Sequence, residues 1–136
     1  MGTRHLIAVY LDGVHKVAQY GQWDGYPGGA GSDVLNFLRG ITSDPSLEEQ
    51  FKANVRSCTW IEEAELKELW ESQTSNEFRI NFPEFSRDTG SKILSLIREN
   101  PNLRLHDQLS FATDGLFCEW AYMIDFDCRT FEVYKG

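Results

Sequence analysis

The side chains best suited to chemistry in this chain gather in one short segment, QWDGYP, which runs from Gln22 to Pro27. It places an amide and a carboxylate (Gln22 and Asp24) next to two aromatic rings (Trp23 and Tyr26). Aromatic walls with a few hydrogen-bonding groups are typical of pockets for polar, planar ligands such as a base or a sugar. The alternative is structural, with the Asp24 side chain capping a turn and Trp23 covering the edge of the core.

A glycine-rich run follows this segment, since residues 27–31 read PGGAG before a predicted helix. Backbone N–H groups of such a loop, together with the N-terminus of a helix, can bind a phosphate group. The run has neither the Gly-Lys-Ser/Thr of a nucleoside-triphosphate loop nor the spacing of a dinucleotide fingerprint. It therefore predicts either an anion site or a flexible connection between a strand and a helix.

Two charged residues extend the candidate site. Arg4 carries a guanidinium that suits a carboxylate or a phosphate, or that forms an ordinary salt bridge. Glu119 interrupts the apolar stretch FCEWAYMI, so it lies either on a solvated face or in a buried pair with Arg4 across the sheet. The predicted ligand-binding set is Arg4, Gln22, Trp23, Asp24, Tyr26 and Glu119.

A hydroxyl near the start of the chain gives an enzymatic alternative. Thr3 precedes a predicted strand–turn–strand, and Asp24 lies near the end of the returning strand. This arrangement resembles the N-terminal nucleophile hydrolases, in which the free amine of the first residue activates its own side chain. The resemblance implies Thr3 as the nucleophile and Asp24 as a helper. Removal of Met1 exposes Gly2, so the mechanism requires that Gly2 is lost as well.

The histidines and cysteines of the chain show no pattern typical of a metal site. We expect no cofactor and no catalytic residue. The three histidines, which lack metal-ligand spacing, are His5, His15 and His106. The three cysteines form no CxxC pair and indicate reduced thiols in a cytoplasmic compartment. Among them, Cys118 is expected in the core.

Composition excludes several classes of function. The chain has 136 residues, with 21 acidic and 13 basic side chains and a net charge of −8. This charge disfavours nonspecific binding of nucleic acid and suits a basic partner protein. No run approaches the ~20 apolar residues of a membrane-spanning helix. We therefore expect one cytoplasmic domain over residues 1–136, bound to neither nucleic acid nor membrane, with a homo-oligomer left open.

The elements that position the candidate residues lie at the two ends of the chain. Alternating apolar residues predict β-hairpins over residues 3–22, with a turn at Asp12-Gly13, and over residues 117–134. Both faces of the first strand are apolar, so both are expected to be covered. Two end hairpins with helices between them predict an α+β fold, with an antiparallel sheet of four or five strands and three or four helices on one face.

Caps and apolar periodicity predict four helices between the hairpins. Their starts are expected at Ser32 or Asp33, at Ser46 in a capping-box pattern with Glu49 after the Asp44-Pro45 break, at about Ile61, and at Asp88 or Thr89. The third helix, over residues 61–72, is expected to bury Leu66, Leu69 and Trp70. Residues 73–86 are expected to be irregular, with a short strand at 78–82, and residues 102–115 to hold one short strand at most.

The two ends of the chain resemble a group of small, uncharacterised proteins from phages and other microbes. The resemblance is carried by the MGTR start, the QWDGYP and glycine-rich loop, and the EWAY…FEVYKG end, and not by the middle helices. It implies no activity, catalytic residue or cofactor. A compact acidic phage protein in the host cytoplasm would act on a host defence system, by sequestering a signal molecule or by blocking a host protein.

The preferred prediction is a noncatalytic protein that binds a small polar or nucleotide-like ligand at the six residues named above. One alternative is a hydrolase that uses Thr3. Another is an acidic inhibitor that binds a basic surface of a host defence protein.

Overall fold

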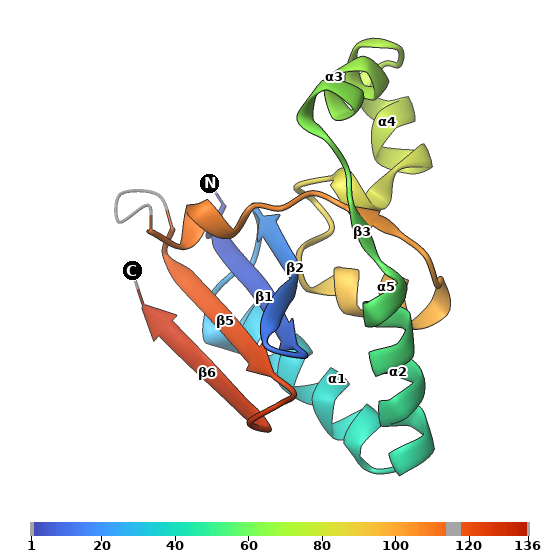
Figure 1. Cartoon of the computed structure of the whole chain (residues 1–136). Helices are drawn as coiled ribbons and strands as arrows, with labels where there is room; N and C mark the ends of the chain where they lie inside the picture. Colours follow the sequence, from blue (N-terminus) through green and yellow to red (C-terminus); the bar gives the residue numbers. More distant parts are fainter. Residues whose placement is uncertain (1, 114–117, 136) are drawn as a thin grey trace.

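A four-stranded sheet forms the centre of the computed structural model, which describes residues 2–113 and 118–135 (Figure 1). Its strand order is β2-β1-β5-β6. The N-terminal hairpin supplies β1 (His5–Leu11) and β2 (Val14–Gly21). The C-terminal hairpin supplies β5 (Trp120–Asp125) and β6 (Thr130–Lys135). The predicted α+β class and both end hairpins are confirmed.

The sheet is mixed, which corrects the prediction of a purely antiparallel one. Each hairpin is antiparallel, but β1 and β5 run parallel, with Ile7 opposite Tyr122. A parallel pair needs a crossover connection, and the long chain between the hairpins provides it. The alternation of apolar residues within each hairpin does not indicate which strands of the two hairpins pair, or in which direction. The prediction assumed that they pair in the antiparallel direction found within each hairpin.

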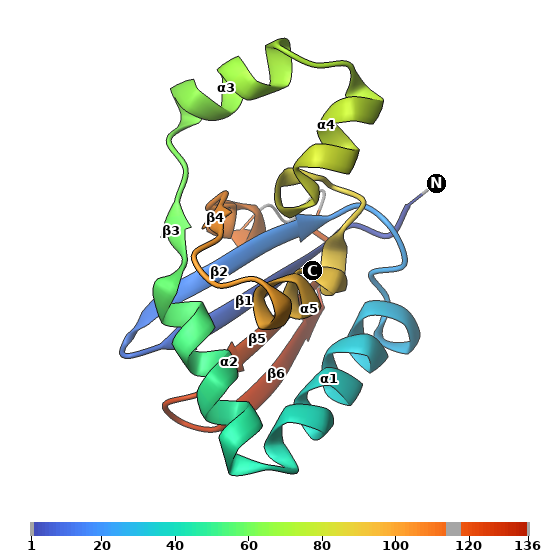
Figure 2. The same ribbon diagram turned by 90° about the vertical axis from the view of Figure 1, so that its right-hand side faces the viewer.

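One face of the sheet is covered by α1 (Ser32–Thr42), α2 (Pro45–Ser57) and α5 (Ile93–Glu99) (Figure 2). Helices α1 and α2 begin close to their predicted starts, but the cap of α2 is Asp44 rather than Ser46, because the Asp44 carboxylate accepts from the Ser46 N–H group at 2.9 Å. Helix α5 begins at Ile93, after a 3₁₀ turn over Gly90–Lys92, and so starts later than the predicted cap at Asp88 or Thr89. Side chains of both layers form the main core, among them Ile7, Val9, Val34, Phe51, Val55, Ile93, Ile97 and Tyr122.

The opposite face is covered over β1 by a 3₁₀ segment, Leu109–Thr113. Leu6 and Ala8 on this face pack with Cys118 and Ala121, against a rim that includes Phe111. Both faces of β1 are therefore buried, as its doubly apolar pattern predicts, and Cys118 lies in the core as expected.

Two short strands, β3 (Thr59–Trp60) and β4 (Arg104–Leu105), pair in parallel beside the main sheet. Beyond β3 the chain forms α3 (Glu63–Glu71) and α4 (Ser75–Asn81), which we call the arm because they project away from the sheet (Figures 1 and 2). Within the described ranges, no helix is both long and apolar enough to cross a membrane.

The arm corrects two predictions. Residues 75–81 are helical rather than irregular, because Thr74 and Glu77 form a capping box at the start of α4. The prediction that α3 buries one face is wrong, since Leu66 and Leu69 are half-buried and Trp70 is 52% exposed. Projecting from the sheet, α3 has no second layer to pack on, so its apolar side chains stay near the surface.

The buried side chain of His5 is in close contact with three glycines. His5 is 1% exposed, and a Cβ atom at Gly21 would lie 2.3 Å from its Cε1 atom, while one at Gly25 would lie 2.5 Å from its Nδ1 atom. Gly90, which has a positive φ of 50°, closes the third side of the ring. Close approach of the imidazole therefore requires glycine at Gly21 and Gly25, whereas at Gly90 the positive φ favours it. Among the atoms described, its Nε2 has no hydrogen-bond partner.

The burial of His5 predicts a loss of stability in mild acid. Burial lowers the pKa of His5 from its ordinary value of 6.5, against smaller opposing effects of the Thr3 carbonyl and Asp24. As pH falls below 6.5, the unfolded chain takes up this proton before the folded chain does. The free energy of unfolding should therefore decrease from pH 7.5 towards pH 5. Urea unfolding at both pH values measures this change.

An NMR titration of the imidazole Cε1–H signals separates His5 from the two other histidines. A His15→Gln/His106→Gln variant is the control, because His5 is its only histidine and its unfolding should still weaken towards pH 5. Titration of His5 at or above pH 6.5 would contradict the prediction.

Candidate functional site

The structure brings the six sequence-predicted residues to one end of the sheet but does not gather them around one cavity. Arg4 and Glu119 meet through the backbone, since the Arg4 N–H group donates to Glu119 Oε2 at 2.8 Å and the Glu119 N–H group donates to the Arg4 carbonyl at 3.1 Å. Glu119 is exposed. Of the two alternatives left open for it, the solvated face is the one observed.

Gln22 and Trp23 hold a neighbouring segment in place. The Gln22 N–H group donates to the Arg87 carbonyl at 3.0 Å, and Trp23 Nε1 donates to Asp88 Oδ1 at 2.7 Å. The Gln22 amide oxygen is itself engaged, because it accepts from the Tyr20 hydroxyl at 2.8 Å. These bonds fasten residues 86–88 to the end of β2.

Asp24 and Tyr26 shape the turn that leads into α1. Asp24 has a left-handed φ of 52°, and its carbonyl accepts from the Ala30 N–H group at 2.7 Å. The Tyr26 carbonyl accepts from the Gly29 N–H group at 2.9 Å. These N–H groups of the glycine-rich run are used inside the turn, so they are not free to cradle a phosphate. The tyrosine ring is 47% exposed.

The thiols and the metal-ligating side chains offer little chemistry. Cys58 and Cys118 are buried, Cys128 is exposed, and all three are free. Across residues 2–113 and 118–135, no group of three or more His, Cys, Asp or Glu side chains could hold a metal ion. Thr3 lies beside the turn, with its carbonyl accepting from the Gly25 N–H group at 3.1 Å.

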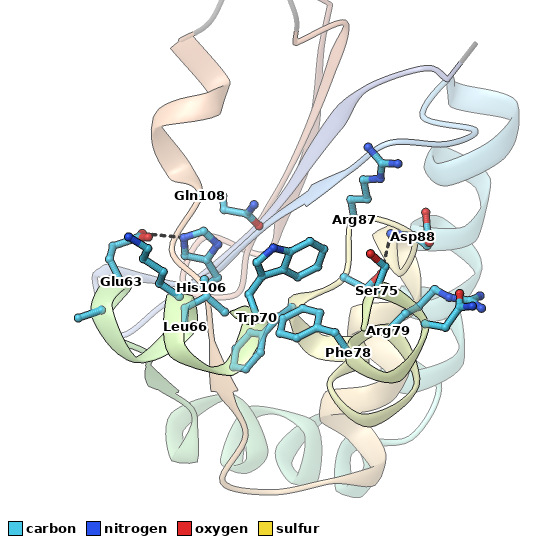
Figure 3. A pocket seen from close by; sticks show the side chains of 15 residues that line it. Glu63, Leu66, Trp70, Ser75, Phe78, Arg79, Arg87, Asp88, His106 and Gln108 are labelled. Atoms are coloured by element: carbon cyan, nitrogen blue, oxygen red, sulfur yellow. Dashed lines mark hydrogen bonds and ion pairs between the residues drawn. The ribbon is translucent and has the colours of Figure 1, made fainter. Parts of the chain in front are cut away.

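A groove of about 1000 Å³ separates the arm from the body of the protein (Figure 3). Its walls come from α3, α4, the segment from Phe85 to Asp88, and the loop that holds His106 and Gln108. None of the six predicted residues lines it. Two of them lie directly behind its wall, because Gln22 and Trp23 hold Arg87 and Asp88.

Trp70 lies at the centre of the groove (Figure 3). Its indole meets the ring of Phe78 edge-on, with 4.9 Å between ring centroids and 79° between planes. Phe78 in turn contacts Phe82 and Phe85, so a small aromatic cluster supports the indole from below. Because half of the Trp70 surface remains exposed, the groove contains an aromatic ring that is held in place yet open to a ligand.

Charges in the groove favour an anion. Arg79 and Arg87 both line the groove, on the same side of Trp70 (Figure 3), and neither forms an ion pair with any residue that the structure describes. Its two carboxylates are already hydrogen-bonded, Glu63 to His106 Nε2 at 2.7 Å and Asp88 to Trp23. The groove thus has unneutralised guanidinium groups in a chain whose net charge is −8.

Sequence reasoning missed the groove for an identifiable reason. It placed Trp70 on a buried helix face and predicted an irregular segment over residues 73–86 in place of α4. Two walls of the groove were therefore predicted wrongly. The Thr74-x-x-Glu77 pattern was the available signal, since it is a capping box ahead of a helix.

Comparison of the chain with protein-family models, with curated proteins and with solved structures found no match in any of the three. The resemblance of the two chain ends to small phage proteins therefore stays a prediction. The function proposed below is argued from the geometry of the groove.

The bond between Trp23 and Asp88 predicts that Trp23 keeps the groove wall in place. Trp23→Phe removes the donor and should cost roughly 1 kcal/mol or less of stability, because the bond is exposed. Amide hydrogen exchange in residues 86–90 should become faster. Trp60→Phe is the matched control, since Trp60 is an exposed tryptophan on β3. Equal exchange rates in the two variants would show that Trp23 does not position the wall.

Proposed function

We propose that this is a noncatalytic binding protein for a small, planar, anionic ligand of the nucleotide class, held in the groove between the arm and the body. The observation that carries the proposal is the half-exposed indole of Trp70 with the unpaired guanidinium groups of Arg79 and Arg87 at the same groove. The ligand class agrees with the prediction from the sequence. The proposed site moves from the QWDGYP loop to the groove behind it.

Stacking on Trp70 is the first contribution to binding. A base stacked on an aromatic side chain gains about 1–3 kcal/mol, and any of the bases can stack because each has a flat π-face. Trp70 is suited to this role because its indole packs against Phe78 and still leaves half of its surface exposed in the groove. Its limited freedom before binding reduces the entropy that a ligand must overcome.

Phosphate binding is the second contribution. A guanidinium group donates two parallel hydrogen bonds to phosphate oxygens and keeps its charge at any relevant pH. Arg79 and Arg87 come from α4 and from the body, so a bridging phosphate would also join the two walls. The groove volume of about 1000 Å³ is at the upper end of small-molecule sites, which leaves room for more than one nucleotide unit.

Hydrogen bonding to the base is the third contribution. The Gln108 side chain is oriented, because its Oε1 atom accepts from the Tyr20 N–H group at 3.0 Å. This bond leaves the amide NH₂ group as a donor for a carbonyl oxygen or ring nitrogen of the ligand. Ser75 and Asn76, at the start of α4, add further polar groups to the groove.

The proposal is noncatalytic because the groove holds no activated nucleophile. Its histidine, His106, is bonded to Glu63, and its Ser86 hydroxyl accepts from the Asp88 N–H group at 3.1 Å. Among the described residues that line the groove, no hydroxyl is hydrogen-bonded to a histidine. A nucleophile next to a base is the arrangement that covalent catalysis requires.

Calorimetric titration with a panel of mono-, cyclic and dinucleotides tests the proposal. We expect micromolar affinity for at least one of them, and a loss of at least about fivefold in Trp70→Ala, given the stacking energy. Arg79→Gln and Arg87→Gln should each weaken binding, whereas Arg39→Gln, on the distant helix α1, should not. All four variants should keep the thermal midpoint within a few degrees, because each of these side chains is largely exposed.

Two results would reject this function. One is the absence of binding by every nucleotide in the panel at millimolar concentration. The other is an equal loss of affinity in Arg39→Gln, which would show that attraction to any surface cation, and not the groove, is being measured.

The hydrolase alternative has its own test, which does not depend on the groove. Intact-mass measurement of the mature protein gives its first residue. If Gly2 is retained, the terminal amine does not belong to Thr3, and the N-terminal nucleophile mechanism is excluded. A chain that begins at Thr3 would revive it. Action on a host defence system stays a prediction, and the identity of the bound ligand would specify which signal is sequestered.

A further inference from the structure

The two edges of the main sheet differ in how they are covered. At the β2 edge, the Ala18 carbonyl accepts from the Gln108 N–H group at 3.0 Å, and the Tyr20 N–H group donates to the Gln108 side chain at 3.0 Å. Beyond β2, the Gln22 N–H group is bonded to Arg87. At the other edge, β6 forms backbone hydrogen bonds with β5 alone, as far as the described chain extends. Figure 1 shows β6 at the open side of the sheet.

Strand β6 has few of the features that keep edge strands from pairing. It has no proline, its register with β5 is continuous, and all of its residues except Phe131 are exposed. Two of the exposed side chains are large and apolar or aromatic, Val133 at 46% and Tyr134 at 51%. An uninterrupted, exposed edge of this kind is a template for another strand.

A hollow of about 460 Å³ lies next to β6 on the face of the sheet opposite the helices. Its floor includes Ala121 and Met123 of β5, and its outer wall is formed by Thr130, Glu132 and Tyr134. The 3₁₀ segment that covers β1 on this face reaches it at Ala112. A side chain that projects from a strand added beyond β6 would lie on this face of the sheet.

We propose that two copies of the chain pair through β6 as antiparallel strands centred on Val133, which joins two four-stranded sheets into one. This inference is independent of the proposed function of the groove. If the two-fold axis is normal to the sheet, the same face of both copies lies on the same side of the joined sheet. Directly opposed residues then point to the same face, so their residue numbers are both odd or both even. Each possible register is therefore centred on one residue, which pairs with its own copy.

Charge selects the register. Centred on Glu132, the pair would place two carboxylates directly opposite each other, which is destabilising. Centred on Val133, it places Glu132 opposite the partner's Tyr134, and Phe131 opposite the partner's Lys135. The latter register uses every residue from Phe131 to Lys135 and opposes no like charges.

The side chains in this register are complementary. Within one chain the Tyr134 hydroxyl already donates to the Glu132 carboxylate. The same donor and acceptor face each other across the proposed interface, once on each side of the two-fold axis. The ring of the partner's Tyr134 lies on the face that contains the hollow. On the helix-covered face, Val133 meets the partner's Val133 and gains apolar burial.

The net charge predicts how the pairing responds to salt. Each copy carries −8, so two copies repel each other at long range. Salt screens this repulsion more than it affects hydrogen bonds between backbones, so association should strengthen as ionic strength rises. The strand–strand contact is also small, which places it among weak, transient interfaces. We therefore expect a dissociation constant in the micromolar range.

Sedimentation velocity from about 1 μM to about 1 mM protein, at low and high salt, tests the association. The native chain should pass from monomer to dimer, at lower concentration in high salt. Val133→Lys places two positive charges at the centre of the interface and should stay monomeric. Val14→Lys changes an equally exposed valine at the start of β2 and should dimerise like the native chain.

Disulfide trapping tests the register. In a Cys128→Ser background, Val133→Cys places two thiols directly opposite each other and should give a cross-linked dimer on mild oxidation. Glu132→Cys places them about 7–8 Å apart on the diagonal, beyond disulfide reach, and should cross-link poorly. Circular dichroism of each variant confirms that it is folded.

Three results would overturn the inference. They are a native chain that remains monomeric over the whole concentration range, a folded Val133→Lys variant that still dimerises, and faster cross-linking of Glu132→Cys than of Val133→Cys.

Discussion

Parallel pairing of β1 with β5 is the constraint on which the rest of this structure depends. It joins two hairpins that are far apart in the sequence and makes β1 an inner strand, buried on both faces. It also brings the two hairpin turns together, so that the Asp127 carboxylate accepts from the N–H groups of Asp12 and Gly13 at 3.0 and 2.7 Å. Parallel strands need a crossover connection, and the described helices all lie within it, between the two hairpins.

The crossover contains more residues than are needed to cover the sheet, and the additional helices α3 and α4 form the arm. Helices α1, α2 and α5 already cover the sheet, so α3 and α4 have no further core to join. They are held instead by the cluster around Phe78, by the hydrogen bond between His106 and Glu63, and by the ion pair between Arg104 and Glu65. Surface ion pairs contribute little each, so the arm rests mainly on its aromatic contacts. The groove exists because the arm stands apart from the sheet, and its aromatic floor is the cluster that supports the arm.

Most of the local elements could be predicted from the sequence, but the way in which they pack and pair with one another could not. The Asp12-Gly13 turn and the alternating residues around it determine the first hairpin, and α2 follows the predicted break at Asp44-Pro45, although Asp44 and not Ser46 caps it. The parallel pair of β1 and β5 is a long-range contact that no local pattern encodes. The exposure of Trp70 likewise depends on where α3 lies in space and not on its periodicity. The capping box at Thr74 and Glu77 could have predicted α4, but the position of the arm relative to the sheet, which creates the groove, could not be read from any local pattern.

The glycine- and aromatic-rich loop, which the sequence analysis proposed as a binding site, packs around His5 in the structure. Gly25 approaches the imidazole too closely for any side chain, and its carbonyl accepts from the Tyr122 hydroxyl at 2.6 Å. Burial raises the pKa of Tyr122 to about 12, so this hydroxyl stays protonated and keeps donating. On the far side of the ring, Gly90 ends the same segment whose Arg87 forms the groove wall. The neutral imidazole therefore fixes both the loop and the wall, and residues that look like a binding site in the sequence act on the groove by positioning it.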